Sequence, residues 1–328
     1  MTATTSKLST LRLVYPPISN QEAFWLENDE EVQKLLKQSD FYIIAGRGEA
    51  KFSDISVDAE EKILGMKFNL GEEFSDEVII DVRMLPSFEN TPDIDFLVEG
   101  GEKLIRIWSL DGEGNRDQVM DWFTTEKLLF DTSRGKSGIL GFERYREAYR
   151  YDLLYVGIAK VGDSYERLIA HGHKARTAIL SNEPQRLPGA RVTDEIYMLL
   201  FRVEPLFITS FDADHEFDDD EDLVPSIQTK SVVADAEKAF VRLLDPKYNS
   251  VKYSSYPKGA DGLYEENLAR YSYVVGENLT LDSAKGRFRG SWNPALQFIS
   301  NDGDCIFVED DKVELLLSGV HYAIDKAE

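Results

Sequence analysis

The chain has 328 residues, which is enough for two or three domains, and carries a net charge of −23. That charge excludes a protein that coats nucleic acid through a basic surface, because such binding depends on neutralising phosphates. A single cysteine, Cys305, excludes an internal disulfide framework and, with only four histidines, argues against a structural zinc site. No apolar run approaches the roughly 20 residues of a membrane helix, and residues 1–13 lack the plan of a secretory signal, so we expect a cytoplasmic protein without a membrane partner.

Residues 1–140 predict a mainly β N-terminal domain. A loose polar arm at 1–20 and an amphipathic helix at 21–39 come first, and the apolar run 41–45 then predicts a strand that ends at Gly46. Short apolar or alternating runs predict further strands at 50–57, 64–70, 77–84, 94–98, 104–108 and 119–123. The last two flank a glycine-containing turn and therefore predict a hairpin.

A basic, glycine-containing stretch follows, with Gly135, Lys136 and Ser137 in a row. A phosphate-binding loop of the Gly-Lys-Ser type needs a glycine five residues before Gly135, where Phe130 stands. The stretch therefore predicts a basic connector rather than a nucleotide site, and residues 141–150 after it predict a short helix or turn.

The chain is organised around residues 151–177. Their first six residues, Tyr-Asp-Leu-Leu-Tyr-Val, predict a buried strand that carries Tyr155. Ser164 is placed to cap a helix of about two turns. Arg167 and His171 lie four residues apart on that helix and therefore share one face.

The next segment combines a predicted central strand at 195–203 with eight acidic residues in 212–222. A calcium-binding EF-hand loop is excluded, because Phe217 and Leu223 occupy the positions that need glycine and glutamate. The simpler interpretation of the acidic run is a solvated loop. The alternative is a phosphate mimic that shields residues 160–191, the one segment with an excess of basic side chains.

Alanine and larger apolar residues recur at helical spacing over 232–244 and predict an amphipathic helix, which Pro246 ends. Glu237 lies in the middle of this helix, beside its apolar face. Short apolar runs between 286 and 322, separated by turns rich in Asp, Asn and Gly, predict a β-rich C-terminal region.

In their order, these pieces resemble the second half of the motif set of the GIY-YIG nucleases. The resemblance covers residues 151–249, and it rests on Tyr155-Val156-Gly157, Arg167 with His171, Ala236-Glu237-Lys238-Ala239 and Pro246-Lys247-Tyr248-Asn249. In that family, a Tyr-Ile-Gly strand precedes a helix with an arginine, and a later helix carries a metal-binding glutamate before a Pro-x-Tyr-Asn segment. The family's first motif, a Gly-Ile-Tyr strand, has no clean match, since the nearest candidate, Gly138-Ile139-Leu140, lacks the tyrosine. The tyrosines that could replace it are Tyr145, Tyr149 and Tyr151.

The predicted elements, together with the resemblance for the middle part, give an α+β chain in three parts. These are the mainly β domain at 1–140, a GIY-YIG-like module at 141–260 and the β-rich region at 261–328. The middle module would be a small mixed sheet flanked by helices, with the acidic run 212–222 as an insertion.

The resemblance also implies metal-assisted hydrolysis of a phosphodiester. Mg²⁺ or Mn²⁺ would be held by Glu237, and Arg167 would neutralise charge on the phosphorus as it is attacked. Tyr155 would orient or deprotonate the attacking water, and His171 would assist it as a base or hold the tyrosine. The residues expected to bind substrate are Lys160, His173, Lys174, Arg176 and Asn249, the last of which would also support the helix of Glu237.

Two functions follow as hypotheses. The first is a metal-dependent endonuclease that cleaves nucleic acid, with DNA expected as the substrate rather than RNA. Its setting would be antiphage defence or conflict between mobile elements. The second is an inactive, acidic interaction protein that keeps a nuclease-like fold and binds a protein partner, as a DNA mimic or as a subunit of a defence complex. The acidic composition favours the second hypothesis, and the presence of Arg167, Glu237 and Asn249 favours the first. Taken singly, each of these residues has an ordinary structural explanation, such as a surface ion pair or an exposed helix acid.

Overall fold

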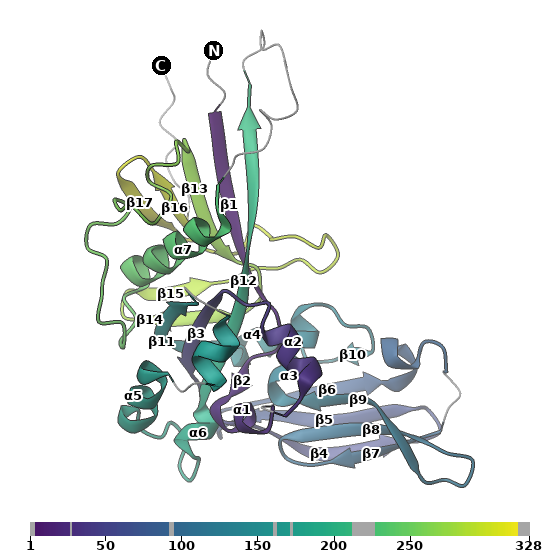
Figure 1. Cartoon of the computed structure of the whole chain (residues 1–328). Coiled ribbons are helices and arrows are strands. Elements are labelled where there is room, and N and C mark those ends of the chain that lie inside the picture. The colour runs from purple at the N-terminus through teal and green to yellow at the C-terminus, as the bar shows by residue number, and fades with distance from the viewer. Residues whose placement is uncertain are drawn as a thin grey trace.

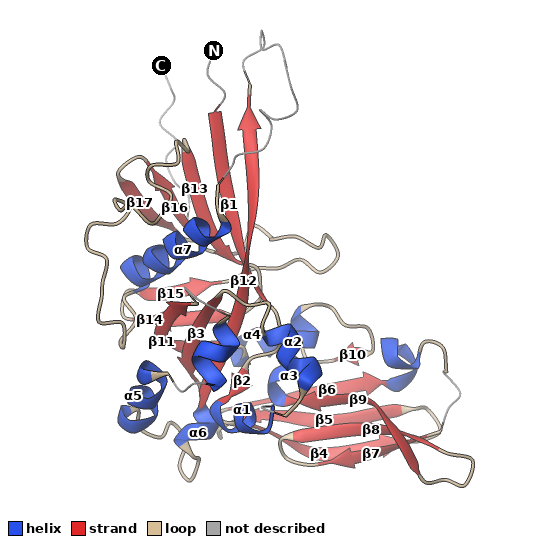
Figure 2. Ribbon diagram, in the orientation of Figure 1, coloured by secondary structure: helices blue, strands red, loops and turns tan. Residues whose placement is uncertain are grey.

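The structure is a computed structural model of the chain, and it describes residues 4–26, 28–91, 95–159, 163–170, 173–211 and 227–320. The fold is mixed α/β and consists mostly of strands, as Figure 2 shows. Among the described residues, no helix is long and apolar enough to cross a membrane.

One large mixed sheet runs through the molecule, and in the described part of the chain it has ten strands (Figure 1). The strands follow the order β15-β14-β11-β3-β12-β1-β13-β16-β17, with the short β2 paired to β12. Their bounds are β1 Thr4–Leu13, β2 Ile18–Ser19, β3 Phe41–Gly46, β11 Arg150–Ile158, β12 Ile196–Ser210, β13 Arg270–Val275, β14 Thr280–Ser283, β15 Gly286–Arg289, β16 Cys305–Glu309 and β17 Lys312–Leu316. The pairs β1–β13 and β11–β14 are parallel, and the other pairs are antiparallel.

The main sheet takes strands from all three regions that the sequence predicted as separate. Strands β1 and β3 come from the first 46 residues, β11 and β12 from the middle of the chain, and β13 to β17 from its last sixty residues or so. The predicted boundaries at 140 and 260 therefore do not separate sheets, and the sheet that holds β11 is larger than the small one expected. Local apolar runs indicate strands, but backbone pairing over long sequence distances decides which strands share a sheet.

Residues 4–13 form strand β1, where the sequence predicted a loose arm. Polar and apolar residues alternate there, and Leu11 and Leu13 are buried while Arg12 between them is less so. β1 lies between β12 and β13, so its backbone groups are paired along both edges. The predicted helix at 21–39 is two short helices, α1 (Asn20–Leu26) and α2 (Glu30–Leu36). The break arises because Asp29 caps α2, accepting hydrogen bonds from the backbone amides of residues 31 and 32.

Residues 50–140 form two smaller sheets beside the main one, as expected for a mainly β region (Figure 1). The first contains β4 Ala50–Asp58, β5 Ile63–Leu70, β6 Phe74–Asp81 and β10 Ile139–Leu140, and the second contains β7 Phe96–Gly100, β8 Leu104–Leu110 and β9 Arg116–Thr124. The predicted hairpin is confirmed as β8–β9. Both sheets turn large apolar side chains into the same core, Phe52 and Phe68 from one and Ile105 and Phe123 from the other.

Helices cover parts of the main sheet. The helix α7, Thr229–Leu244, matches the predicted amphipathic helix and ends at Asp245, which takes a left-handed conformation just before Pro246. Its Phe240 ring packs against Phe41 of β3 and Phe288 of β15, with ring centres 5.5 and 5.4 Å apart. The other helices are α3 Thr125–Ser133, α4 Tyr145–Ala148, a short π-helix at Glu166–Ala170, α5 Lys174–Asn182 and α6 Val192–Glu195, with 3₁₀ turns at Val82–Met84 and Pro86–Phe88.

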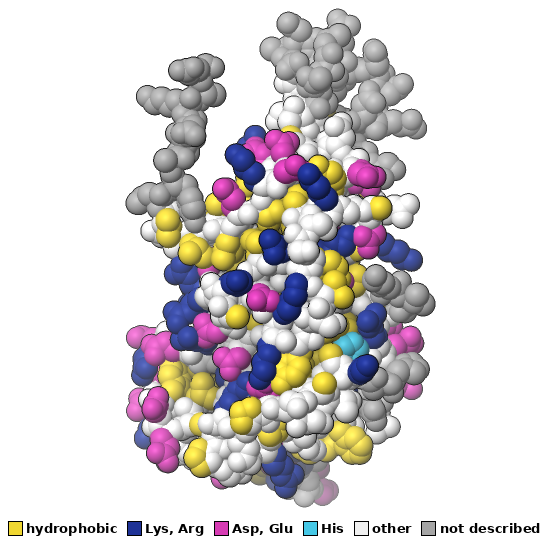
Figure 3. All heavy atoms as spheres, turned by 90° about the vertical axis from the view of Figure 1, so that its left-hand side faces the viewer, with side chains coloured by type: hydrophobic (Ala, Val, Ile, Leu, Met, Phe, Trp, Pro, Cys, Tyr) yellow, Lys and Arg dark blue, Asp and Glu magenta, His cyan; other side chains and the backbone are white. Residues whose placement is uncertain are grey.

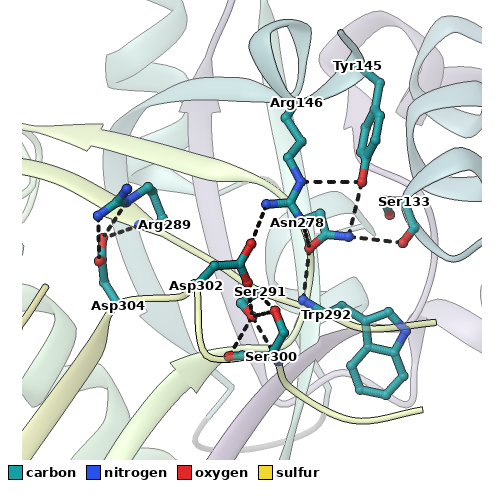
Figure 4. A network of polar contacts seen from close by, with 10 residues as sticks. All are labelled: Ser133, Tyr145, Arg146, Asn278, Arg289, Ser291, Trp292, Ser300, Asp302 and Asp304. Carbon is teal, nitrogen blue, oxygen red and sulfur yellow. Dashed lines mark hydrogen bonds and ion pairs between the residues drawn. The ribbon is translucent and has the colours of Figure 1, made fainter. Parts of the chain in front are cut away.

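A hydrogen-bond network ties the C-terminal loops to the helices α3 and α4 (Figure 4). The amide nitrogen of Asn278 donates to the carbonyl of Ser133 and to the hydroxyl of Tyr145, at 3.2 and 3.1 Å. Its amide oxygen accepts from the backbone of Trp292 and from Arg146, at 2.8 and 3.0 Å. One buried side chain thus satisfies groups from three segments, which fixes the loop after β13 against the helical layer.

Candidate active site

Strands β3 and β11 bring two tyrosines together. Their antiparallel register sets Gly157 opposite Tyr42 and Tyr155 opposite Ile44. The rings of Tyr42 and Tyr155 stack with centres 6.1 Å apart. Gly157 makes this possible, because a Cβ there would lie 2.6 Å from the hydroxyl oxygen of Tyr42 and 2.8 Å from the ring of Tyr155. The glycine of the Tyr-Val-Gly sequence therefore makes room for both phenols.

His173 contacts both tyrosines of this pair. Its Nε2 lies 3.1 Å from the hydroxyl oxygen of Tyr42, and its ring meets both tyrosine rings edge-on. Burial, with the nearby charges of Arg167 and Arg176, lowers the pKa of His173 below its ordinary value. The imidazole is therefore neutral near pH 7, and its Nε2 can accept the hydroxyl proton of Tyr42 if Nδ1 carries the ring proton.

Arg167 and Glu237 act electrostatically on the same two tyrosines. Burial raises the pKa values of Tyr42 and Tyr155, the charge of Glu237 raises them further, and the charge of Arg167 opposes both effects. Arg167 is exposed on the π-helix, while Glu237 is partly exposed on α7. The two side chains predicted to stabilise phosphate and to hold metal therefore lie in the electrostatic reach of one tyrosine pair.

A third tyrosine contacts Glu237. The hydroxyl of Tyr253 donates to the carboxylate of Glu237 at 3.3 Å. Burial and this carboxylate raise the pKa of Tyr253 to about 12, so the phenol stays protonated and remains a donor at neutral pH. This contact was not predicted, because the loop after α7 carries many tyrosines and no spacing distinguishes Tyr253 from the others.

The segment after α7 forms hydrogen bonds with the backbone of β11. The side chain of Asn249 bonds to both backbone groups of Val156, accepting from its N–H at 2.9 Å and donating to its carbonyl at 2.8 Å. The backbone N–H of Tyr248 donates to the carbonyl of Leu154 at 2.9 Å. Asn249 was expected to bind substrate or to support the helix of Glu237. Because both ends of its amide bond to Val156, it instead positions the strand that carries Tyr155.

The other residues that were expected to bind substrate differ in how far they are exposed. Lys174 is exposed at the start of α5. Arg176 is half-buried and already bonded, donating to the side-chain oxygen of Asn20 at 2.6 Å and to the carbonyl of Leu168 at 2.9 Å. Lys160 and His171 lie outside the described residues, as does the acidic run 212–222.

The helix of Arg167 also begins differently from the prediction. Ser164 is buried, and its hydroxyl has no hydrogen-bond partner among the described residues. The capping role belongs to Asp163, whose carboxylate accepts from the backbone N–H of Glu166 at 2.9 Å. The helix α5, which follows and begins after His173, was not predicted.

Sequence reasoning missed Tyr42. It considered only tyrosines close to β11 in sequence, namely Tyr145, Tyr149 and Tyr151, whereas the strand that pairs beside Tyr155 begins more than a hundred residues earlier. Two signals pointed to it: the strand at 41–45 was predicted, and it contains the tyrosine. Tyr151 belongs to a different cluster, since its hydroxyl accepts from Arg47 at 3.2 Å.

The described residues contain no group of three or more His, Cys, Asp or Glu side chains placed to hold a metal ion. A single carboxylate is enough for one class of ion, because Mg²⁺ commonly binds through one or two carboxylates and keeps several waters or substrate phosphates. Glu237 is partly exposed, and its charge and that of the exposed Arg167 both act on Tyr155. Glu237 therefore fits a site of that kind.

Comparison with known proteins adds no assignment: no protein family, no curated protein and no solved structure matches the chain.

Proposed function

We propose that the protein is a metal-dependent nuclease with a site of the GIY-YIG type, in which Tyr42 supplies the tyrosine of the first motif. The observation that carries this proposal is the assembly of Tyr42, Tyr155, Arg167 and Glu237 around one strand pair, with Gly157 making room for the phenols. Three segments distant in sequence contribute these groups, with Tyr155 and Arg167 coming from one of them, so their meeting is a property of the fold and not of a local sequence pattern.

Glu237 would hold one Mg²⁺ or Mn²⁺, which supplies a positive charge at the scissile phosphate and at the leaving oxygen. Arg167 would bind the phosphate from its exposed position, and its guanidinium would stabilise the negative charge that grows there in the transition state.

The tyrosines and His173 would form a proton relay. Tyr155 is the partly exposed phenol, whereas Tyr42 is fully buried behind it and bonds to His173. Because both phenols have raised pKa values, they stay protonated and act as donors and acceptors rather than as free phenolates. A proton taken from the attacking water at Tyr155 can pass through Tyr42 to the neutral imidazole of His173.

A second candidate remains, the inactive acidic interaction protein. The net charge of −23 favours it, because it opposes the approach of a polyanion. On the face shown in Figure 3, Lys and Arg side chains are interspersed with Asp and Glu, with no broad basic surface. For a nuclease, such a face predicts contacts with only a few phosphates near the cleaved bond, and therefore a shallow dependence of binding on salt.

Cleavage of plasmid DNA, single-stranded DNA and RNA at low salt distinguishes the two candidates. Wild type, Glu237→Gln and the exposed control Glu61→Gln are compared in Mg²⁺, in Mn²⁺ and with a chelator. The nuclease proposal predicts metal-dependent cleavage by wild type and the control only. Absence of cleavage of all three substrates by every protein would favour the interaction protein.

A further inference from the structure

A cavity lies between helix α1 and the strands β8 and β9, built from residues that the proposed nuclease site does not use. Its volume is about 510 Å³, within the range of small-molecule sites. The elements around it are β2, α1, α2, the starts of β4 and β8, the second half of β9, the first turns of α3 and α6, and the start of β12.

Aromatic rings form much of the wall. Trp25, Trp122, Tyr15 and Tyr197 all line the cavity. The indole of Trp25 is 64% exposed, and its neighbour Phe24 is 68% exposed. Large aromatic side chains left open beside a cavity are the usual lining of a site for an organic ligand.

The charges around the cavity are unbalanced. Six carboxylates line it (Glu22, Asp29, Glu31, Glu49, Glu126 and Asp194), against the two basic side chains of Lys103 and Arg106, and one of the six, Glu126, pairs with Arg47 outside the cavity. Both basic groups are already paired, Lys103 with Glu49 and Asp194, and Arg106 with a glutamate outside the cavity. Among the described residues, no cation forms an ion pair with Glu22, whose carboxylate accepts only from the backbone N–H of Ser19.

A buried polar group faces the same space without a partner. Tyr15 lines the cavity and is 8% exposed, and its hydroxyl has no hydrogen-bond partner among the described residues. The charges of Glu22 and Asp29 act on this hydroxyl, which places it on the acidic side of the cavity. A buried hydroxyl beside an uncompensated carboxylate is satisfied by a ligand that brings a positively charged donor.

We propose that this cavity binds a small organic cation, an ammonium, amidinium or guanidinium group on a flat or apolar body. The body would lie against Trp25 and Trp122, and the charged group would face Glu22 and the Tyr15 hydroxyl. Anionic ligands are disfavoured by the carboxylates of the lining, and a neutral ligand would leave the ionised form of Glu22 uncompensated.

The ionisation of Glu22 gives the proposal a second readout. Burial, with the charge of Glu126 from α3, raises the pKa of Glu22 to about 8, against the lowering effect of the Ser19 backbone. The other charged groups around the cavity are Asp29 and Glu31 on α2, Glu49 before β4, Lys103 and Arg106 at β8, and Asp194 on α6. A cation needs the ionised carboxylate, so its affinity should increase about tenfold between pH 7 and pH 9, as the ionised fraction increases.

Three probes of one shape test the proposal: benzamidine, benzamide and benzoate, which are cationic, neutral and anionic. Isothermal titration and the fluorescence of the tryptophans measure binding at pH 7 and at pH 9, where the amidinium stays charged. We expect benzamidine to bind one site at least about tenfold tighter than benzamide, more tightly at pH 9, and benzoate to show no binding. Equal affinity for benzamidine and benzamide would overturn the proposal.

Two variants locate the site, and one controls for bulk charge. Glu22→Gln keeps the capping contact of α1 and should lower benzamidine affinity at least about tenfold, while leaving benzamide binding unchanged. Trp25→Leu, at an exposed position that folding does not depend on, should weaken both ligands. Glu61→Gln, distant on the β4–β5 hairpin, should change nothing. Equal losses for Glu61→Gln and Glu22→Gln would mean that the probe follows net charge, and would overturn the proposed site.

Discussion

Two clusters with tyrosine, arginine and glutamate in common flank strands β3 and β11, and they differ in how far their charged groups are exposed to solvent. The open cluster contains Tyr42, Tyr155, Arg167, His173 and Glu237. The closed cluster contains Arg47, Glu126, Tyr151 and Tyr197. Each combines two tyrosines with one arginine and one glutamate, so His173 is the one difference in composition between them.

In the closed cluster every donor of the arginine is used. Arg47 is 4% exposed, pairs with Glu126, donates to the hydroxyls of Tyr151 and Tyr197, and also reaches the backbone carbonyls of Gly48 and Ala148. Its guanidinium lies 4.9 Å from the centres of both tyrosine rings. In the open cluster, by contrast, the arginine is exposed and the glutamate partly so.

The comparison shows that perturbed tyrosines alone do not indicate function. Burial raises the pKa values of Tyr151 and Tyr197 as it does those of Tyr42 and Tyr155. What separates the clusters is access to solvent for the charged groups. A closed cluster holds strands together, whereas an open one keeps its charged groups within reach of solvent and of a ligand.

Arg47→Met should have the largest effect, and it should be on stability. It leaves the carboxylate of Glu126 buried without its cation, which costs about 3–5 kcal/mol of unfolding free energy. Denaturant unfolding measures the loss, and adding Glu126→Leu should restore much of it. A loss below about 1 kcal/mol would mean that the closed cluster is not structural.

Arg167→Ala should act on activity instead. Removing a donor that serves the transition state should lower the cleavage rate about 10²- to 10³-fold. Because the side chain is exposed, unfolding free energy should change by no more than about 0.5 kcal/mol. Arg144→Ala, another exposed arginine, is the control; equal rates for the two variants would contradict the assignment.

Tyr42→Phe should have an intermediate effect, since it removes the hydroxyl between Tyr155 and His173. We expect a ten- to a hundredfold lower cleavage rate, as for groups that position a catalytic side chain. Tyr264→Phe is the control, because that hydroxyl bonds to Asp311 at the surface. A Tyr42→Phe enzyme with the wild-type rate and pH profile would refute the relay.

His173 should give the smallest effect, a pH dependence of stability. Its pKa is lowered in the folded protein, so below about pH 6.5 the unfolded chain takes up a proton that the folded protein excludes. The free energy of unfolding that neutral His173 contributes is therefore present in full above the pKa that the histidine has in the unfolded chain. It is lost as the pH falls toward the lower pKa of His173 in the folded protein. Unfolding of wild type and His173→Gln from pH 5 to 8 should show the wild type gaining relative stability as pH rises, and the reverse slope would contradict the assignment.

Much of the local structure could be predicted from sequence, because local patterns determine it. The strand of Tyr155, the helix of Glu237 and its end at Pro246 follow from apolar spacing and from proline chemistry. The strand of Tyr42 was predicted too, but its partner was not. About a hundred residues separate β3 from β11 in the sequence, and no local sequence pattern predicts a contact over that distance.

The same limit explains the other differences. Strand β1 was missed because its alternation is mostly of polar residues, and β12 and β13 stabilise it from both sides. Asn249 was identified as important, but its role depends on the backbone of Val156 beside it, which is a tertiary contact. The cation cavity depends on side chains from nine elements, and none of them is unusual alone.

Binding of Mn²⁺ tests the central claim most directly, because it needs no knowledge of the substrate. Mn²⁺ is titrated into wild type, Glu237→Gln and the control Glu61→Gln, and bound metal is measured by electron paramagnetic resonance. The account predicts a site in wild type and in the control that Glu237→Gln loses. Equal binding by all three proteins, or none by wild type, would contradict a metal site at the open cluster.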